Sequence, residues 1–363
     1  MGSTYKKIRD IVFKRTTPLC FLPNGKLVCF RDGSLLIINK DKVEKTIPMQ
    51  HGFKENALAR FKAVNRLLRL GIRTAIAMDD DHIIVSYGNI IKEVDLTNGH
   101  ISKGYKCEQG TRPLIFTKVK GIKGFEDGFY YGDYIGRLDK MPVKIYRRTG
   151  IDNWEAVYTF STGLINHIHN IIPDPYRNCL WIMTGDFGEA AAFWKATDMF
   201  TEMERVACND QKYRGCVGFV LKEGILYATD SPLTQNHIYL FNPSDKSCRE
   251  ISAISGSCIY GCQWKDGYVF STTVEPDGKY KNKLDFIFKW KIGAGIQDRY
   301  SRIYYGMPND GFAVIHKEKK DWLPFIFQFC SIKFPIGKND SDFLYFMPVA
   351  SKKHDMSLIS ISM

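Results

Sequence analysis

Residues 18–49, PLCFLPNGKLVCFRDGSLLIINKDKVEKTIPM, contain four short apolar runs separated by turn residues. Asn24-Gly25 and Asp32-Gly33 are pairs that readily adopt the positive φ angles of two-residue hairpin turns, and Lys40-Asp41 marks a third turn. The apolar runs between these turns are short, as strands are. The stretch therefore predicts four antiparallel strands joined by hairpins.

The same layout recurs along the chain about every 40–55 residues, the spacing of the blades of a β-propeller. Further copies occupy residues 73–106, 112–160, 167–206, 214–251 and 257 to about 317, and a last copy from 325 has only three strands. The strand-like segment 5–15 precedes the first copy, and ring closure would let it complete the last blade, so that no sheet edge is left open. The sequence predicts one all-β domain over 1–363, a seven-bladed β-propeller, with six or eight blades as alternatives. The single predicted helix, 53–69, lies between blades one and two.

The chain carries 51 Lys and Arg against 39 Asp and Glu, a formal net charge of +12. Such a field attracts polyanions, although a charge that merely maintains solubility is the alternative. We expect no nucleic-acid partner, because neither an RNP-type aromatic motif nor a helix-turn-helix pattern is present. No apolar run is long enough for a transmembrane helix. The ten cysteines are scattered without CxxC pairs and the N-terminus does not resemble a secretory signal, which favours a cytoplasmic location.

One face of a propeller carries both the start of each inner strand and the loop between the second and third strands. In blade four, His167 and His169 begin the inner strand HIHNIIP, and Asp186 and Glu189 lie in the loop GDFGEA. Residues two apart on a strand point to the same side. The four side chains are therefore predicted to meet at the channel mouth.

The same projection brings residues of neighbouring blades to this mouth. They are Arg69, Arg73 and Arg112, Asp133, Tyr134 and Arg137, Arg214, Asp230, Asn236 and His237, and Glu275 and Lys279. Arginine forks suit carboxylate, sulfate or phosphate, and His with Tyr suits acid and base catalysis. We predict catalytic roles for His167, His169, Tyr134, Asp186 and Glu189, and substrate binding by Arg73, Arg112, Arg137, Arg214, Asp133, Asp230 and His237. No cofactor is required by these residues.

A divalent metal ion is a second prediction for the histidine pair. His167 and His169 supply two ligands, and Asp186 or Glu189 would supply a third. The structural alternative is that the histidines only hydrogen-bond neighbouring blades, and that the arginines pair with carboxylates between blades.

The segment RRTGIDNWEAVYTF (147–160) resembles a degenerate Asp-box, the turn between the third and fourth strands of sialidase-like propellers. The usual motif is Ser/Thr-x-Asp-x-Gly-x-x-Trp. Trp154 occupies its final Trp position, whereas Gly150 and Asp152 do not fall at the Gly and Asp positions of the motif. A weaker echo, WKATDMFTEMERV (194–206), has Phe200 in the aromatic place. The wider region 110–206 is similar to bacterial sialidase-like propellers, some found with polysaccharide genes. The resemblance implies the fold; Asp-boxes are structural turns on the far face, and no Arg-Ile-Pro segment of a true sialidase occurs.

Propeller polysaccharide lyases offer a second analogy, in which His or Tyr removes the proton next to a uronate carboxylate and Arg neutralises that carboxylate. His167, His169 and Tyr134, with Arg112 or Arg214, match those residue types. Our first hypothesis is a carbohydrate-active or carbohydrate-binding propeller for an acidic oligosaccharide or polysaccharide, either a glycoside hydrolase or a polysaccharide lyase. The alternatives are a non-catalytic scaffold that docks an acidic partner, and a hydrolase with a carboxylate pair.

Overall fold

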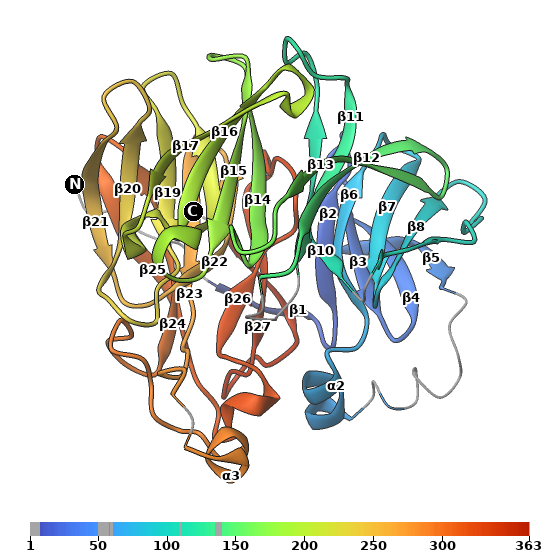
Figure 1. Ribbon diagram of the computed structural model, residues 1–363. Helices are drawn as coiled ribbons and strands as arrows, with labels where there is room; N and C mark the ends of the chain where they lie inside the picture. The colour runs from blue at the N-terminus through green and yellow to red at the C-terminus, as the bar shows by residue number, and fades with distance from the viewer. Residues whose placement is uncertain are drawn as a thin grey trace.

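Seven four-stranded antiparallel sheets form the blades of the protein in a computed structural model (Figure 1). The structure describes residues 8–49, 58, 61–108, 111–134, 140–279 and 281–362. In blades one to six the strands follow one another in chain order, which confirms the predicted seven-bladed propeller.

The first three blades cover the N-terminal part of the chain. Blade one consists of β2 Thr17–Phe21, β3 Leu27–Arg31, β4 Ser34–Asn39 and β5 Lys42–Pro48. Blade two consists of β6 Ile72–Ala77, β7 His82–Tyr87, β8 Ile90–Asp95 and β9 Tyr105–Lys106. Blade three consists of β10 Arg112–Val119, β11 Gly128–Tyr134, β12 Val143–Gly150 and β13 Asn153–Phe160.

Blades four to six follow the same pattern. Blade four consists of β14 His167–Asp174, β15 Cys179–Gly185, β16 Ala192–Thr197 and β17 Glu202–Cys208. Blade five consists of β18 Gly215–Val220, β19 Ile225–Thr229, β20 Asn236–Asn242 and β21 Ser247–Ile254. Blade six consists of β22 Cys258–Trp264, β23 Gly267–Thr272, β24 Tyr300–Met307 and β25 Gly311–Lys319.

Blade seven joins the two ends of the chain. It consists of β26 Ser331–Lys333, β27 Phe343–Val349, β28 Leu358–Ser362 and the N-terminal β1 Ile8–Phe13. β1 pairs antiparallel with β28, with Ile8 opposite Ile361. The predicted closure by the N-terminal strand is confirmed, and it satisfies an edge that would otherwise expose unpaired backbone groups.

Two of the three predicted turns of blade one have the expected backbone, whereas Asn24 and Gly25 lie in the five-residue connection 22–26, in which Gly25 has a positive φ of 83°. Asp32 and Gly33 have φ of 47° and 81°, and Lys40 and Asp41 have φ of 46° and 66°. Two consecutive positive φ angles match the right-handed twist of the flanking strands, so each of these two turns joins its strands in two residues.

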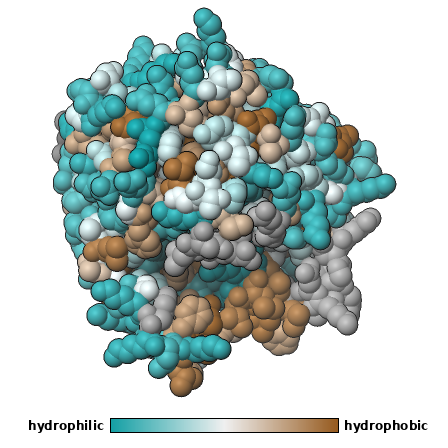
Figure 2. Space-filling view, in the orientation of Figure 1, coloured by the Kyte–Doolittle hydropathy of each residue, from teal (hydrophilic) through white to brown (hydrophobic). Residues whose placement is uncertain are grey.

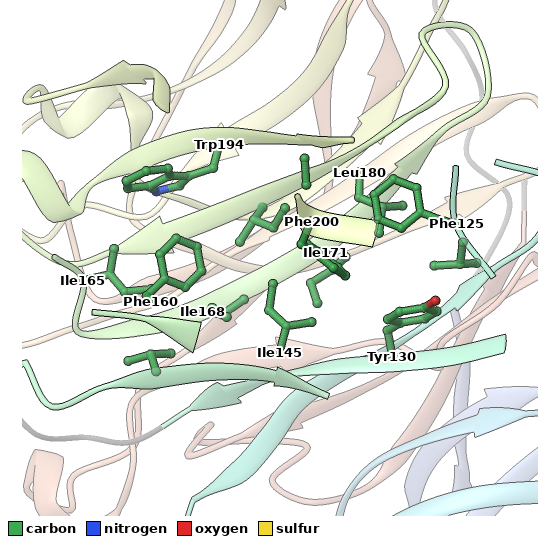
Figure 3. Packing of buried hydrophobic residues seen from close by; sticks show 14 of the residues in the cluster. Phe125, Tyr130, Ile145, Phe160, Ile165, Ile168, Ile171, Leu180, Trp194 and Phe200 are labelled. Atoms are coloured by element: carbon green, nitrogen blue, oxygen red, sulfur yellow. The ribbon is translucent and has the colours of Figure 1, made fainter. Parts of the chain in front are cut away.

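The core lies between adjacent blades, and Figure 3 shows the part between blades three and four. Phe160 of β13 packs edge-to-face against Trp194 of β16, with ring centroids 5.2 Å apart. Ile168 of the inner strand β14 is buried in the same cluster. Since each fully buried side chain of this size contributes about 1.5–3 kcal/mol, this packing fixes the inner strand that carries the histidine pair.

Two short helices lie on the same side of the propeller, α2 Lys62–Leu68 and α3 Lys283–Ile287 (Figure 1). The predicted helix 53–69 was too long at both ends of α2, because Phe61 before it has an extended backbone with φ of −88° and ψ of 108°, and Arg69 after it is left-handed with φ of 53°. Most of residues 53–61 lie outside the described residues. Single-turn 3-10 helices occur at η2 Gly188–Ala190, η3 Asp198–Phe200, η4 Gln211–Tyr213 and η5 Phe325–Phe327. No helix in the described ranges is long and apolar enough to cross a membrane. The ten cysteines are free thiols, and eight of them are buried.

Candidate functional site

A β-bulge interrupts the inner strand of each of blades one to six near its start. In blade four the register shifts between Ile168 and Asn170, so that His169 has no partner on β15. In blade two the shift falls between Ile72 and Thr74, at Arg73. A bulge re-aims the extra side chain, and here the re-aimed side chains line the central channel. They are Leu19, Arg73, Leu114 and Ile115, His169, Cys216 and Ile259.

The channel opens into a polar cavity of about 170 Å³ on the face that carries α2 and α3. Its polar lining comes from blades two to six and the segment that leads into blade seven, and consists of Arg69, Arg73, Tyr134, His169, Asp186, Arg214, Cys216, Asp230, Tyr260, Glu275, Gln328 and Ser331. The structure therefore brings half of the sixteen predicted mouth residues to the lining of one cavity.

His167, His169 and Asp186 form a buried cluster at the wall of this cavity. The Nε2 atoms of the two histidines lie 2.9 Å apart, and Asp186 Oδ1 is 3.4 Å from that of His167 and 3.6 Å from that of His169. His169 Nδ1 lies 3.0 Å from the Gly215 carbonyl oxygen. Because a carbonyl only accepts, Nδ1 carries the proton and Nε2 of neutral His169 keeps a lone pair toward the cluster.

Gly185, at the end of β15, provides the space for the His169 ring. A Cβ atom at position 185 would lie 2.3 Å from His169 Cε1. Any side chain there would displace the imidazole, so glycine at this position is required for the observed ring orientation. Burial lowers the pKa of His169, which keeps its imidazole neutral near pH 7.

The same three atoms fit a divalent transition-metal ion. Ligand atoms that lie about 2.1 Å from one ion are about 3.0–3.4 Å from each other, close to the separations in the cluster. A neutral His169 with its Nδ1 proton held by a carbonyl is also the usual form of a metal-bound histidine. Arg214 would compete with a metal ion for Asp186, because Arg214 Nη2 lies 3.1 Å from Asp186 Oδ1, the oxygen that would bind the ion.

Arg214 lies among three carboxyl groups, those of Asp186, Asp230 and Glu275. Its guanidinium also lies 3.5 Å from Asp230 Oδ2. Burial alone would raise the pKa of Asp186, but the two imidazoles and Arg214 outweigh it and hold that pKa well below its usual range. Burial raises the pKa of Asp230 to about 8 despite Arg214, and it also raises the pKa of Glu275. Arg214 is thus an internal counter-ion rather than a cation available to a ligand.

Arg69, Arg73 and Arg112 make up the opposite side of the mouth and have no ion pair in the described part of the chain. Burial and the neighbouring guanidiniums of Arg73 and Arg69 lower the pKa of Arg112 to about 10. Burial also lowers the pKa of Arg73, whose Cζ lies 4.9 Å from the ring centroid of Tyr134. Three like charges gathered without a counter-ion among the described residues have the chemistry that suits an anion.

Three residues predicted for the mouth are placed elsewhere. Glu189 lies on η2, is mostly exposed, and pairs with Arg205, because the 3-10 turn directs it away from the histidines. His237 lies on the third strand of blade five beside Tyr239 and Glu250. Asp133 is buried and accepts hydrogen bonds from Thr111 and the Lys144 backbone N–H, so it joins loops of its own blade.

Two more residues predicted for the mouth, Asn236 and Lys279, also do not line the cavity. Asn236 is a buried link between Ser231 and Gly295, and Lys279 is exposed beside α3. Arg137 lies outside the described residues. Cys216, Tyr260 and Gln328 line the cavity and were missed. The inner-strand bulge explains Cys216, which occupies the position of His169 in the next blade, whereas Gln328 lies in an irregular segment that no periodicity marks.

Helix α2 is held beside the mouth by a buried arginine. Arg66 forms ion pairs with Asp321 and Asp355, and its Nε donates to the Phe327 carbonyl oxygen at 2.6 Å. Gln328 Nε2, which lines the cavity, donates to the Arg66 carbonyl oxygen at 3.0 Å. Arg66 therefore links the connection between blades one and two to the segment before blade seven.

We expect Arg66→Met to lower the free energy of unfolding by about 3–5 kcal/mol, because the buried carboxylates lose their partner. Urea denaturation measures this change. The control is Lys246→Met, which removes the exposed ion pair to Glu204 and should change the free energy by less than about 0.5 kcal/mol. Equal denaturation midpoints for Arg66→Met and the wild type would show that the link is not a stabilising one.

No family model and no curated protein matches the chain. The chain is similar in structure to oligogalacturonate lyase in complex with manganese, with a TM-score of 0.58, 12% identity, and 99% of this chain and 95% of that chain covered. It is also similar to the β-propeller domain of Cps50 (Swd1) from Myceliophteria thermophila, with a TM-score of 0.56, 8% identity, and 99% of each chain covered. The AfRom2 CNH domain gives a TM-score of 0.53 at 10% identity, with 99% and 98% covered.

These similarities concern the fold alone. The propeller implied by the sialidase-like resemblance is confirmed, and the turns at 151–152 and 198–201 do join third and fourth strands. No comparison supports a sialidase or Asp-box relationship. The chain is a seven-bladed β-propeller whose channel mouth combines a histidine pair with an arginine cluster that has no ion pair among the described residues.

Proposed function

We propose that the protein binds a uronate-containing oligosaccharide at the channel mouth and cleaves it by β-elimination. The observation that carries the proposal is the cluster of Arg69, Arg73 and Arg112, which has no ion pair in the described ranges and shares its cavity with His169. A carboxylate group of the ligand would supply the missing counter-charge through bidentate hydrogen bonds. The structural similarity to an oligogalacturonate lyase agrees with this substrate class.

The residues next to the arginines match the two proton transfers of an elimination. His169 Nε2 would accept the proton from the carbon next to the carboxylate, a double bond would form between that carbon and the adjacent ring carbon, and the bond from that adjacent carbon to the bridging oxygen would break. The leaving oxygen would take a proton from Tyr134, whose pKa burial raises to about 12 so that the phenol stays protonated. His169 and Tyr134 would then exchange protons with solvent. His167 and Asp186 would orient His169.

A divalent metal ion is an alternative to the base role of His169, because it would be held by the same Nε2 lone pair of His169 together with His167 and Asp186. When bound, such an ion supplies a positive charge that stabilises a carboxylate whose neighbouring carbon loses a proton. Metal analysis of the purified protein, after dialysis against manganese or zinc, tests this part by itself.

The experiment is incubation of the full chain with oligogalacturonate, other uronate oligosaccharides and a neutral oligosaccharide of equal length. We expect binding to the acidic ligands only, together with the ultraviolet absorbance of an unsaturated uronate product. Binding without product would overturn the elimination step and leave the protein as a docking module for an acidic partner. Equal binding to the neutral ligand would overturn the role of the arginine cluster.

Binding of the acidic oligosaccharide should weaken severalfold as the pH rises above about 8. Asp230 has a pKa of about 8 and is protonated below it, so its ionisation adds a negative charge to a mouth that already contains Asp186 and the counter-ion Arg214. One such charge contributes about 1 kcal/mol to the repulsion of an anion. Calorimetric titration from pH 6.5 to about 9 measures the change. Asp230→Asn should remove this pH dependence; if the decrease persists in that variant, another group causes it.

A further inference from the structure

The face that carries the channel mouth also carries large apolar side chains in contact with solvent. Beside α2 these are Phe61, Leu67 and Leu68, and beside α3 they are Leu284, Phe288 and Trp290. We call these six residues the apolar rim. Figure 2 shows apolar surface at the lower edge of the molecule, where Figure 1 places α2 and α3. Trp322, in the segment that contacts α2, is 77% exposed on the same side.

In the α3 segment a charged side chain is buried and large apolar side chains are exposed, which is the reverse of the usual arrangement in a folded protein. Lys289 is only 7% exposed and lies 3.0 Å from Asp277 and 3.5 Å from Asp285. Its neighbour Phe288 is 62% exposed, and Trp290 is also exposed. Ion pairs thus stabilise the base of the loop, while aromatic side chains form its tip. Since exposed apolar clusters are costly in a monomeric soluble protein, this arrangement marks an interaction surface.

Basic side chains surround the apolar rim. Lys279, Lys281, Lys283 and Lys291 are exposed beside α3, and Lys62 is exposed on α2. The acidic residues of this loop, Asp277 and Asp285, are already paired with Lys289. The surface offered to a partner is therefore apolar at its tips and positively charged around them, within a chain of net charge +12.

We propose that the apolar rim docks the protein on an anionic phospholipid membrane. Aromatic and leucine side chains that project beside lysines insert into the boundary between headgroups and acyl chains, and the lysines attract anionic headgroups. The rim consists of two separate projections, α2 and α3, rather than a groove for a peptide (Figure 1). Docking in this way directs the channel mouth toward the membrane. The inference does not depend on the proposed function, although the two together place the acidic glycan at a membrane surface.

The experiment is co-sedimentation of the full chain with vesicles of phosphatidylcholine, alone or mixed with phosphatidylglycerol. We expect binding to the mixed vesicles, weakened by salt. Of the six tryptophans, Trp154, Trp181, Trp194 and Trp264 are buried, so a blue shift of the fluorescence would report Trp290 and Trp322 entering the bilayer.

Leu284→Ser with Phe288→Ser should weaken vesicle binding at least tenfold and remove the blue shift. Lys281→Gln with Lys283→Gln should weaken it about fivefold for each charge, equivalent to about 1 kcal/mol per lysine. The matched control is Ile151→Ser, which removes a 70% exposed side chain at a turn on the opposite face and should have no effect.

Failure to bind mixed vesicles, or binding that the Leu284 and Phe288 variants leave unchanged, would overturn the proposal. Self-association that the same double variant abolishes, without vesicle binding, would identify a second copy of the chain as the occupant and would also overturn it. Glycan binding is measured without vesicles, so failure of the membrane proposal is distinguishable from failure of the glycan site.

Discussion

Replacing both Arg73 and Arg112 with methionine is expected to abolish binding of an acidic oligosaccharide while raising the melting temperature of the protein. A hydrogen bond to a charged group contributes about 1.5–3 kcal/mol, so the loss of two arginines weakens binding by more than about a hundredfold. Calorimetric titration with oligogalacturonate measures the loss.

The stability gain follows from the charges that crowd the mouth. Burial and nearby guanidiniums lower the pKa of Arg112, and burial lowers that of Arg73, so the folded protein disfavours both charged forms. Both arginines are protonated at neutral pH in the folded and unfolded chains, and this cost is therefore present throughout that range. Methionine has similar length and no charge, so the variant keeps the apolar contacts and loses the repulsion.

Arg148 is the matched control for this prediction. Its Nε and Nη2 donate to the two carboxylate oxygens of Glu93, at 2.7 and 2.9 Å, away from the mouth. Arg148→Met should lower the melting temperature and leave glycan binding unchanged. Wild-type affinity in the Arg73 and Arg112 double variant would show that the acidic ligand does not bind at the arginine cluster.

His169→Gln is expected to lower the rate of elimination at least about 100-fold and leave the glycan dissociation constant within about threefold. Glutamine retains a side chain that can hydrogen-bond the Gly215 carbonyl, but it cannot accept a proton near neutral pH. The appearance of unsaturated product gives the rate, and calorimetric titration gives the affinity. His167→Gln should lower the rate less than His169→Gln does, because His167 positions the base.

Two measurements separate the catalytic from the structural role of His169. His237→Gln changes a histidine that pairs with Glu250 on blade five and should retain full activity. A pH–rate profile of the wild type should rise as His169 loses its proton, with a midpoint below pH 6.5 because burial lowers its pKa. An unchanged rate in His169→Gln would remove this residue from the mechanism.

The blade pattern was predictable because the signals that define it are local. Asp32-Gly33 and Lys40-Asp41 specify turns by their own backbone preferences, and the period of strands and turns repeats along the chain. Ring closure by β1 followed from counting three strands in the last copy. Eight residues of the predicted site lie at the cavity or its wall in the structure, and they are His167, His169, Tyr134, Asp186, Arg73, Arg112, Arg214 and Asp230.

The structure places Glu189, His237 and Asp133 away from the cavity, for reasons that the periodicity of strands cannot predict. Glu189 follows Asp186 by three positions, but it lies on a 3-10 turn that directs its side chain toward Arg205 and away from the side chain of Asp186. His237 lies on the third strand of its blade, far from the inner strand. Asp133 accepts hydrogen bonds from Thr111 and from the Lys144 backbone N–H within its own blade. The helix prediction erred for a similar reason, because the left-handed Arg69 ends α2 where the apolar pattern would continue it.

The sequence by itself determined the propeller architecture, its closure and the face on which polar residues gather, because turn and strand preferences act between near neighbours, whereas the count of seven blades was settled by the structure. Only the tertiary structure decided which charges remain without a counter-ion. Arg214 is neutralised by Asp186 and also lies beside Asp230, from two different blades, whereas Arg69, Arg73 and Arg112 lie together with no ion pair in the described residues. Charge pairing depends on distances between residues far apart in the chain, and those distances exist only once the ring has closed.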